Sequence, residues 1–166
     1  MRLFTIGDLH LSFGVPDKPM DIFGGWKDYQ KLLEQNWLER IAPEDTVVLA
    51  GDFSWGMTLA QAEADFAFVQ NLPGQKILLK GNHDYWWASK KKMDDFFTAH
   101  GFNTLHILHN NHYAFGQYGI CGREKLPMPK FWQEKCSGFR FPFSRLWTQD
   151  WNPLCSCTIR RSTERR

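Results

Sequence analysis

The stretch Lys80-Gly81-Asn82-His83-Asp84-Tyr85 follows a short run, residues 76–79, that has the character of a buried strand. An amide, an imidazole and a carboxylate therefore come in succession where that strand ends. The oxygen of Asn82 is a ligand that hard metal ions accept, and His83 can transfer a proton near neutral pH. Asp84 can fix the tautomer and orientation of that imidazole. The triplet alone predicts either a functional site or a polar turn.

Two further stretches favour the functional site, because each ends an apolar strand in a similar way. Phe4-Thr5-Ile6-Gly7-Asp8-Leu9-His10 ends in a carboxylate and an imidazole, and Thr46-Val47-Val48-Leu49-Ala50-Gly51-Asp52 ends in a carboxylate. The glycines permit a tight strand exit and a close backbone approach to a ligand. In an open α/β sheet, ligands bind at the carboxyl ends of the strands. We therefore expect five side chains to converge on one edge of the sheet: Asp8, His10, Asp52, Asn82 and His83.

The three motifs Gly-Asp-x-His, Gly-Asp and Gly-Asn-His-Asp, in this order, resemble those of the calcineurin-like metallophosphoesterases. The neighbouring residues are similar to a group of small bacterial phosphohydrolases of that superfamily, and four segments carry this narrower likeness: 7–12, 21–24, 51–55 and 81–87. The resemblance covers residues 1–122 and not the remainder. It implies an α/β fold, namely the first half of the four-layer αββα phosphoesterase sandwich, followed by an atypical C-terminal tail.

The same resemblance implies a site for two divalent metal ions. Asp52 occupies the place of the ligand that bridges both ions. Asp8 and His10 would complete the coordination of the first ion, and Asn82 would bind the second ion. Oxygen and nitrogen ligands suit Mn²⁺, Fe or Zn²⁺, and the sequence does not distinguish among these metals. Two such ions would clamp the attacking and leaving oxygens of a phosphate ester.

Two residues receive catalytic roles from the resemblance. His83 would not bind metal but would stabilise the phosphoryl oxygens or protonate the leaving group. Asp84 would orient His83. The expected reaction is hydrolysis of a phosphomonoester or phosphodiester, and the expected partner is a phosphate-ester substrate.

The sequence changes character after residue 122. Residues 1–122 contain 10 Lys and Arg against 14 Asp and Glu, whereas residues 123–166 contain 10 against 4 and no histidine. The family's second half would supply a further histidine and a Gly-His-x-His motif, which are absent from this sequence. We therefore interpret 1–122 as an incomplete metallophosphoesterase core and 123–166 as an atypical basic tail, disordered or translated out of frame. Weak metal binding, above all at the second site, and little turnover are expected.

Three alternatives from other classes remain open at this stage. The chain is an inactive phosphoesterase fragment, or it binds nucleic acid through its basic, Trp-containing tail, or another chain completes its site. Cationic side chains attract phosphates and aromatic rings stack on bases, but the tail holds no nucleic-acid-binding motif. Nucleic acid is therefore not the expected partner, and the sequence predicts no oligomeric state.

The composition, with 43% hydrophobic and 23% charged residues, is typical of a globular protein. Asp8 and His10 interrupt the N-terminal apolar run, so no signal peptide is predicted, and no stretch is apolar enough to span a bilayer. The four cysteines form no Cys-x-x-Cys pattern: Cys121, Cys136, Cys155 and Cys157. We expect a cytoplasmic protein with reduced cysteines and no membrane partner.

Hydrophobic periodicity predicts alternating strands and helices. The expected strands are 2–6, 46–50, 76–80, 102–108 and 113–121. The expected helices are 25–41, one capped by Thr58 and ended by 71–74, and 88–100. This order predicts a parallel sheet with right-handed crossovers, followed by a hairpin that turns at Asn110-Asn111.

The aromatic residues of the first predicted helix are assigned to the core, because five apolar side chains recur there at steps of three and four: Trp26, Tyr29, Leu33, Trp37 and Ile41. Trp55 could stack on a substrate, but packing is the preferred interpretation. Asp17 and Asp21 are interpreted as solvated loop carboxylates.

Overall fold

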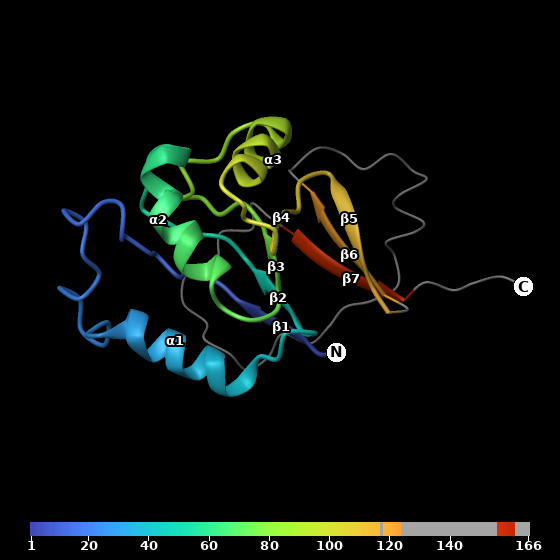
Figure 1. Ribbon diagram of the computed structural model, residues 1–166, viewed down its shortest axis with the longest axis horizontal. Coiled ribbons are helices and arrows are strands. Elements are labelled where there is room, and N and C mark those ends of the chain that lie inside the picture. Colours follow the sequence, from blue (N-terminus) through green and yellow to red (C-terminus); the bar gives the residue numbers. More distant parts are fainter. Residues whose placement is uncertain (117, 124–155, 162–166) are drawn as a thin grey trace, which may run out of the picture. The chain divides into compact units, whose positions relative to one another are not determined.

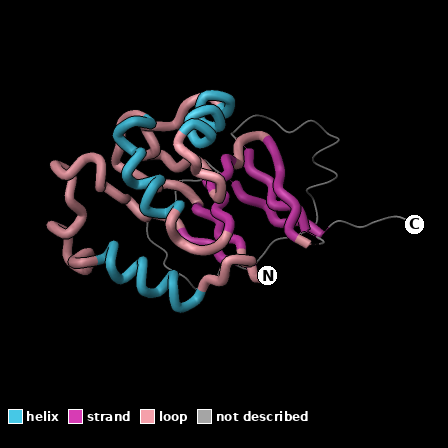
Figure 2. The backbone as a smooth tube through the Cα atoms, in the orientation of Figure 1, coloured by secondary structure: helices cyan, strands magenta, loops and turns pink. Residues whose placement is uncertain are grey.

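A computed structural model of the chain describes residues 1–116, 118–123 and 156–161 (Figures 1 and 2). The chain divides into two compact units, Met1–Ile107 and Leu108–Arg166. Cys136, Cys155 and most of the stretch interpreted as a disordered or out-of-frame tail lie outside the described residues. Among the described residues, no helix is both long enough and apolar enough to cross a membrane.

The first unit is built on a sheet of four parallel strands in chain order: β1 (Leu3–Ile6), β2 (Thr46–Leu49), β3 (Gln75–Leu78) and β4 (Leu105–Ile107). Ile6 pairs with Leu49, and Leu49 pairs with Leu78. The carboxyl ends of β1, β2 and β3 therefore lie level with one another. The loops that follow these strands leave from one edge, which confirms the predicted parallel sheet.

In chain order, one helix connects each strand of this unit to the next: α1 (Tyr29–Arg40), α2 (Leu59–Gln70) and α3 (Lys90–Ala99) (Figure 1). The hydroxyl of Thr58 accepts a hydrogen bond from the Gln61 N–H at 3.2 Å, so the predicted cap of α2 is confirmed. Ser89 caps α3 in the same way. A long loop joins β1 to α1 and follows the first of the strand exits (Figure 2).

The core of this unit centres on Phe66 of α2, which is fully buried. Its ring stacks on Phe53 at a centroid distance of 5.2 Å and meets Trp86 edge-on at 4.9 Å. Burying side chains of this size contributes roughly 1.5–3 kcal/mol each. Because Phe53 follows β2 and Trp86 follows β3, the core directly supports the two loops that carry Asp52 and His83.

A lysine lies inside the strand that precedes the Gly-Asn-His-Asp motif. Lys76 is fully buried, and its amine donates to the Leu72 carbonyl and to the Thr104 hydroxyl. Burial lowers the pKa of Lys76 to about 8. The two acceptors explain how a buried position of β3 holds an amine without disrupting the sheet.

The first helix starts later than predicted. Asp28 has a left-handed backbone with φ of 53°, and α1 begins only at Tyr29. Trp37 and Ile41 are buried and Leu33 packs against the core, as predicted. The core assignment of Trp26 is wrong, because this residue precedes the helix and does not belong to the core.

The second unit also differs from the prediction. The single strand predicted over 113–121 is two strands, β5 (Asn111–Phe115) and β6 (Tyr118–Arg123), which pair antiparallel with each other. Gly116, with φ of 56°, adopts the left-handed conformation that lets the chain reverse between them. The predicted hairpin at Asn110-Asn111 is therefore wrong.

One strand has no counterpart in the prediction. β7 (Ser156–Arg161) pairs antiparallel with β6 and completes a sheet of the order β5-β6-β7. The segment has two β-branched residues, Thr158 and Ile159, which is too short a local pattern to identify a strand. The segment forms a strand because it pairs with β6, which is distant in sequence.

Candidate metal centre

Three residues that follow the carboxyl ends of β1 and β2 have an unusual backbone conformation. Asp8, His10 and Asp52 have φ values of 56°, 45° and 52°. Non-glycine residues rarely adopt this left-handed conformation, and such strain concentrates at functional sites. Hydrogen bonds between the loop after β1 and the loop after β2 maintain this conformation. Asp8 N–H donates to the Gly51 carbonyl at 3.0 Å, and His10 N–H donates to the Asp52 carbonyl at 2.9 Å. The first two exits are thus locked side by side.

Two glycines bring the second and third exits into contact. A Cβ atom on Gly81 would lie 2.1 Å from Oδ1 of Asp52 and 2.2 Å from its backbone nitrogen. A Cβ atom on Gly51 would lie 2.7 Å from the Cα of Gly81, and Gly51 also has φ of 107°. Only glycine fits at these positions. The glycines serve mainly the close approach of one loop to the other.

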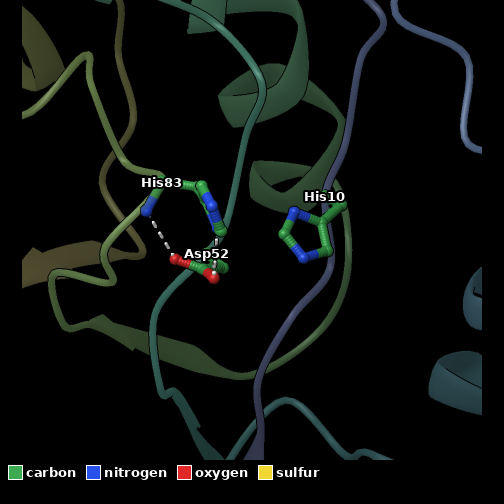
Figure 3. Close-up of side chains that lie close together, drawn as sticks. All are labelled: His10, Asp52 and His83. Carbon is green, nitrogen blue, oxygen red and sulfur yellow. Dashed lines mark hydrogen bonds and ion pairs between the residues drawn. The ribbon is translucent and has the colours of Figure 1, made fainter. Parts of the chain in front are cut away.

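Three side chains meet where these loops converge. One donor atom from each of His10, Asp52 and His83 can be chosen so that all three lie within 4.8 Å of one another. Nδ1 of His83 lies 3.0 Å from Oδ2 of Asp52, and the His83 backbone N–H donates to Oδ1 at 2.9 Å. Figure 3 shows this double contact, with the ring of His10 beside the pair.

The three donors fit a divalent transition metal. Nδ1 of His10 is buried and has no hydrogen-bond partner among the described residues. Burial lowers the pKa of His10, against the opposing effect of the Asp52 and Asp8 carboxylates. A neutral imidazole with an unpartnered ring nitrogen, next to the carboxylate of Asp52, which is only 7% exposed as a residue, offers the nitrogen and oxygen donors that Mn²⁺, Fe and Zn²⁺ accept.

The remaining predicted ligands adjoin this group. Oδ1 of Asp8 lies 3.8 Å from Nε2 of His10, and Nδ2 of Asn82 lies 3.2 Å from Nδ1 of His83. Both side chains are exposed. His10, Asp52 and His83 therefore converge at one edge, and Asp8 and Asn82 each adjoin one of the two histidines. The assignment of the predicted ligands stays a prediction.

The expected contact between Asp84 and the His83 ring is wrong. Asp84 is 2% exposed, and five N–H groups donate to its carboxylate: those of the Asp52, Phe53, Ser54 and Gly81 backbones and the Trp86 indole. The side chain is turned inward because these donors from two loops converge on it. Asp84 ties the loops together, and Asp52 is the carboxylate that orients His83.

The exclusion of His83 from metal binding stays a prediction. Its ring nitrogen is one of the three donor atoms that lie within 4.8 Å of one another. The geometry allows His83 either to contact an ion or to stay hydrogen-bonded to Asp52 and face a substrate.

Two tryptophans flank His10. Trp55 stacks on the imidazole with centroids 4.8 Å apart and planes 18° apart, and the Trp26 ring meets it edge-on at 6.1 Å. The preferred packing role of Trp55 thus holds, but its partner is a site residue. Sequence reasoning missed Trp26 because its helical spacing from Tyr29 and Leu33 was sufficient to explain it as core.

A buried carboxylate in α2 supports two of the site's loops. Asp65 is fully buried and accepts hydrogen bonds from the Phe13 N–H at 2.8 Å and from the Ser54 hydroxyl. Burial raises the pKa of Asp65 to about 6. Sequence reasoning missed it, although an acidic residue on the apolar face of a helix, between Ala62 and Phe66, was an available signal.

These features define an α/β protein whose parallel sheet presents a candidate metal centre at its carboxyl edge. The family model for calcineurin-like phosphoesterases matches residues 1–154, and the chain belongs to that family. The match continues past residue 122, so the extent expected from the motifs was too short.

Curated relatives come from two mycobacteriophages. The Gene 66 protein of Mycobacterium phage D29 is 38% identical over 83 residues, which are 50% of this chain and 40% of that protein. The Gene 66 protein of Mycobacterium phage L5 is 30% identical over 77 residues, which are 46% of this chain and 37% of that protein. The chain therefore spans well under two thirds of the length of these relatives.

A solved structure also matches. The crystal structure of AQ665, a protein of unknown function from Aquifex aeolicus, has a TM-score of 0.41 and 24% identity, covering 70% of this chain and 56% of that one.

Proposed function

We propose that this chain carries a metal-dependent phosphoesterase centre that hydrolyses a phosphate ester. The observation that carries the proposal is the position of Asp52. Its nearly buried carboxylate contacts His83 and lies, with His10, in a group of three donors within 4.8 Å of one another. Membership of the calcineurin-like phosphoesterase family supports a phosphate ester as the substrate.

The proposed ligands follow from the strand exits. Asp8, His10 and Asp52 hold a first ion, and Asp52 and Asn82 hold a second. When bound, divalent ions stabilise the negative charge of the phosphoryl oxygens. Fewer of the proposed ligands serve the second ion, so we expect it to bind more weakly than the first. Mn²⁺ is the metal chosen as a probe, with Fe and Zn²⁺ as alternatives.

The proposed role of His83 is to act on the phosphate ester. Asp52 contacts Nδ1 and the backbone N–H of His83, which fixes both the ring and its loop. The His83 side chain is 40% exposed, so a substrate can reach it. A positioned imidazole can stabilise the phosphoryl oxygens or pass a proton to the leaving oxygen.

The test combines metal content with turnover. Asp52→Asn keeps the size of the side chain but removes the charge of the shared ligand. We expect the full chain with added Mn²⁺ to hydrolyse an aryl phosphate with low turnover, and Asp52→Asn to lose both bound metal and that activity. Asp17→Asn, an exposed carboxylate in the loop after β1, is the matched control and should behave as the parent. Full metal content and activity in Asp52→Asn would refute the proposal.

The activity, substrate and partners of the whole protein belong to this proposal, because the chain spans only part of its relatives' length. We also propose a cytoplasmic location, which rests on the cysteine pattern of the sequence.

A further inference from the structure

Three aromatic side chains surround the two histidines of the candidate centre, and we call them the aromatic rim: Trp26, Trp55 and Tyr85. Trp55 lies 4.8 Å from His10 and 5.3 Å from His83, between ring centroids. Each member comes from a loop that follows a different strand of the parallel sheet. The rim is therefore built from the same three exits that supply the proposed ligands.

Packing does not account for Tyr85, the exposed member of the rim. Tyr85 is 55% exposed, and its ring meets His83 edge-on at 6.3 Å. Its neighbour Trp86, by contrast, is 2% exposed and packs in the core. Trp26 is half-buried and lies outside the core that the structure describes. Two large rings are thus held beside a polar site with part of their surface open to solvent.

The chemistry of these rings indicates what they contact. If the phosphate of a bound ester lies at the proposed metal ligands, its organic group can extend past His10 or His83 toward the rim. An exposed aromatic side chain gains most contact energy by stacking on another flat, polarisable ring. Stacking removes one face of each ring from water. Small polar groups such as glycerol would gain little from this surface.

We propose that the aromatic rim selects phosphate esters whose organic group is a planar ring system, with a nucleoside monophosphate as the model case. This inference rests on the proposed phosphoesterase function. Tyr85 is the principal specificity-determining residue, because it is the most exposed member of the rim and adjoins His83, while Trp55 uses one face to hold His10.

A pair of ligands isolates the contribution of the base. Adenosine 5′-monophosphate and ribose 5-phosphate share the same phosphate ester on the same 5′ oxygen, and only the first carries a flat base. Calorimetry on the full chain with Mn²⁺ measures the affinity for each. We expect the nucleotide to bind about 10-fold more tightly, as base stacking on one aromatic side chain typically provides.

Three variants assign that preference to the rim. Tyr85→Ala should reduce the preference for the nucleotide about 10-fold, to near unity, because only the binding of the nucleotide becomes weaker. Tyr85→Phe retains the ring and should restore the preference. Leu38→Ala, a similarly exposed apolar residue on α1, is the control and should leave it unchanged.

The outcomes separate the two proposals. Equal binding of both ligands by the parent chain, or an unchanged preference in Tyr85→Ala, would overturn the rim's role and leave the phosphoesterase function intact. Absence of binding of both ligands, together with no hydrolysis of an aryl phosphate, would overturn the proposed function and the inference that rests on it.

Discussion

His83 contacts both oxygens of the Asp52 carboxylate: its ring Nδ1 lies 3.0 Å from Oδ2, and its backbone N–H donates to Oδ1 at 2.9 Å. Asp52, the expected shared metal ligand, therefore also positions the imidazole of His83, which would act on the substrate. A single carboxylate links the loop after β2 to the loop after β3. Changes that disturb this link should affect metal binding, loop packing or both, and the following experiments separate these effects.

Asp84 should contribute to stability rather than to proton transfer. Asp84→Ala would leave several buried N–H groups of the two loops without an acceptor, and each such group costs roughly 1–3 kcal/mol. We expect a loss of about 3 kcal/mol in the free energy of unfolding, measured by urea denaturation. Asp17→Ala serves as the exposed control. A loss below about 0.5 kcal/mol would show that Asp84 does not tie the loops together.

Asp65 should make the stability depend on pH in the mildly acidic range. Its pKa is raised to about 6 in the folded chain, so between about pH 4 and 6 the folded state binds more protons than the unfolded state. Its contribution to stability therefore falls as the pH rises through this window. Asp65→Asn can accept from Phe13 and donate to Ser54, and it should lack this dependence.

The measurement for Asp65 is urea denaturation of the parent and of Asp65→Asn at several pH values from 4 to 7. The parent should lose about 2–3 kcal/mol relative to the variant across that range. Parallel pH profiles for the two chains would contradict the assignment.

Asp45 should protect the fold against acid without affecting the metal centre. The Arg2 guanidinium, which donates to this carboxylate, holds the pKa of Asp45 at about 2. A lowered carboxyl pKa stabilises the fold above the unfolded value of about 4, and this stabilisation is lost as the pH falls through about 2. Asp45→Asn should lower the urea midpoint at pH 7, and its difference from the parent should disappear toward pH 2.

Metal affinity distinguishes this effect from damage to the site. Asp45 immediately precedes β2, at the opposite end of that strand from Asp52. Mn²⁺ binding by Asp45→Asn at pH 7 should therefore match the parent. A weaker affinity would show that the two edges of the sheet are coupled.

Trp55 should hold His10 in place for the metal. Residues that orient a ligand typically contribute 10–100-fold to metal affinity. Trp55→Leu removes the ring stacked on the imidazole, and we expect about 10-fold weaker Mn²⁺ binding by calorimetry. Trp55→Phe keeps a stacked ring and should retain most of the affinity. Equal affinities for Trp55→Leu and the parent would leave Trp55 with a packing role alone.

The sequence predicts the sheet and the convergence of the site because both depend on local patterns. An apolar strand followed by glycine and a carboxylate can be recognised within a few residues, and parallel strands bring their carboxyl ends to one edge. The roles of Asp84 and Trp26 could not be predicted in this way. They depend on which backbone N–H groups and rings lie nearby in three dimensions. β7 likewise depends on pairing with a strand distant in sequence.

The central claim is that Asp52 is a metal ligand between the exits of β1 and β3, and anomalous X-ray diffraction tests it most directly. Crystals of the full chain grown with Zn²⁺ and measured at the zinc absorption edge would locate the ion. The account predicts an anomalous peak about 2.0–2.2 Å from an Asp52 carboxylate oxygen, with a ring nitrogen of His10 also in contact. Zinc bound elsewhere on the chain, with Asp52 and His10 outside coordination distance, would contradict it.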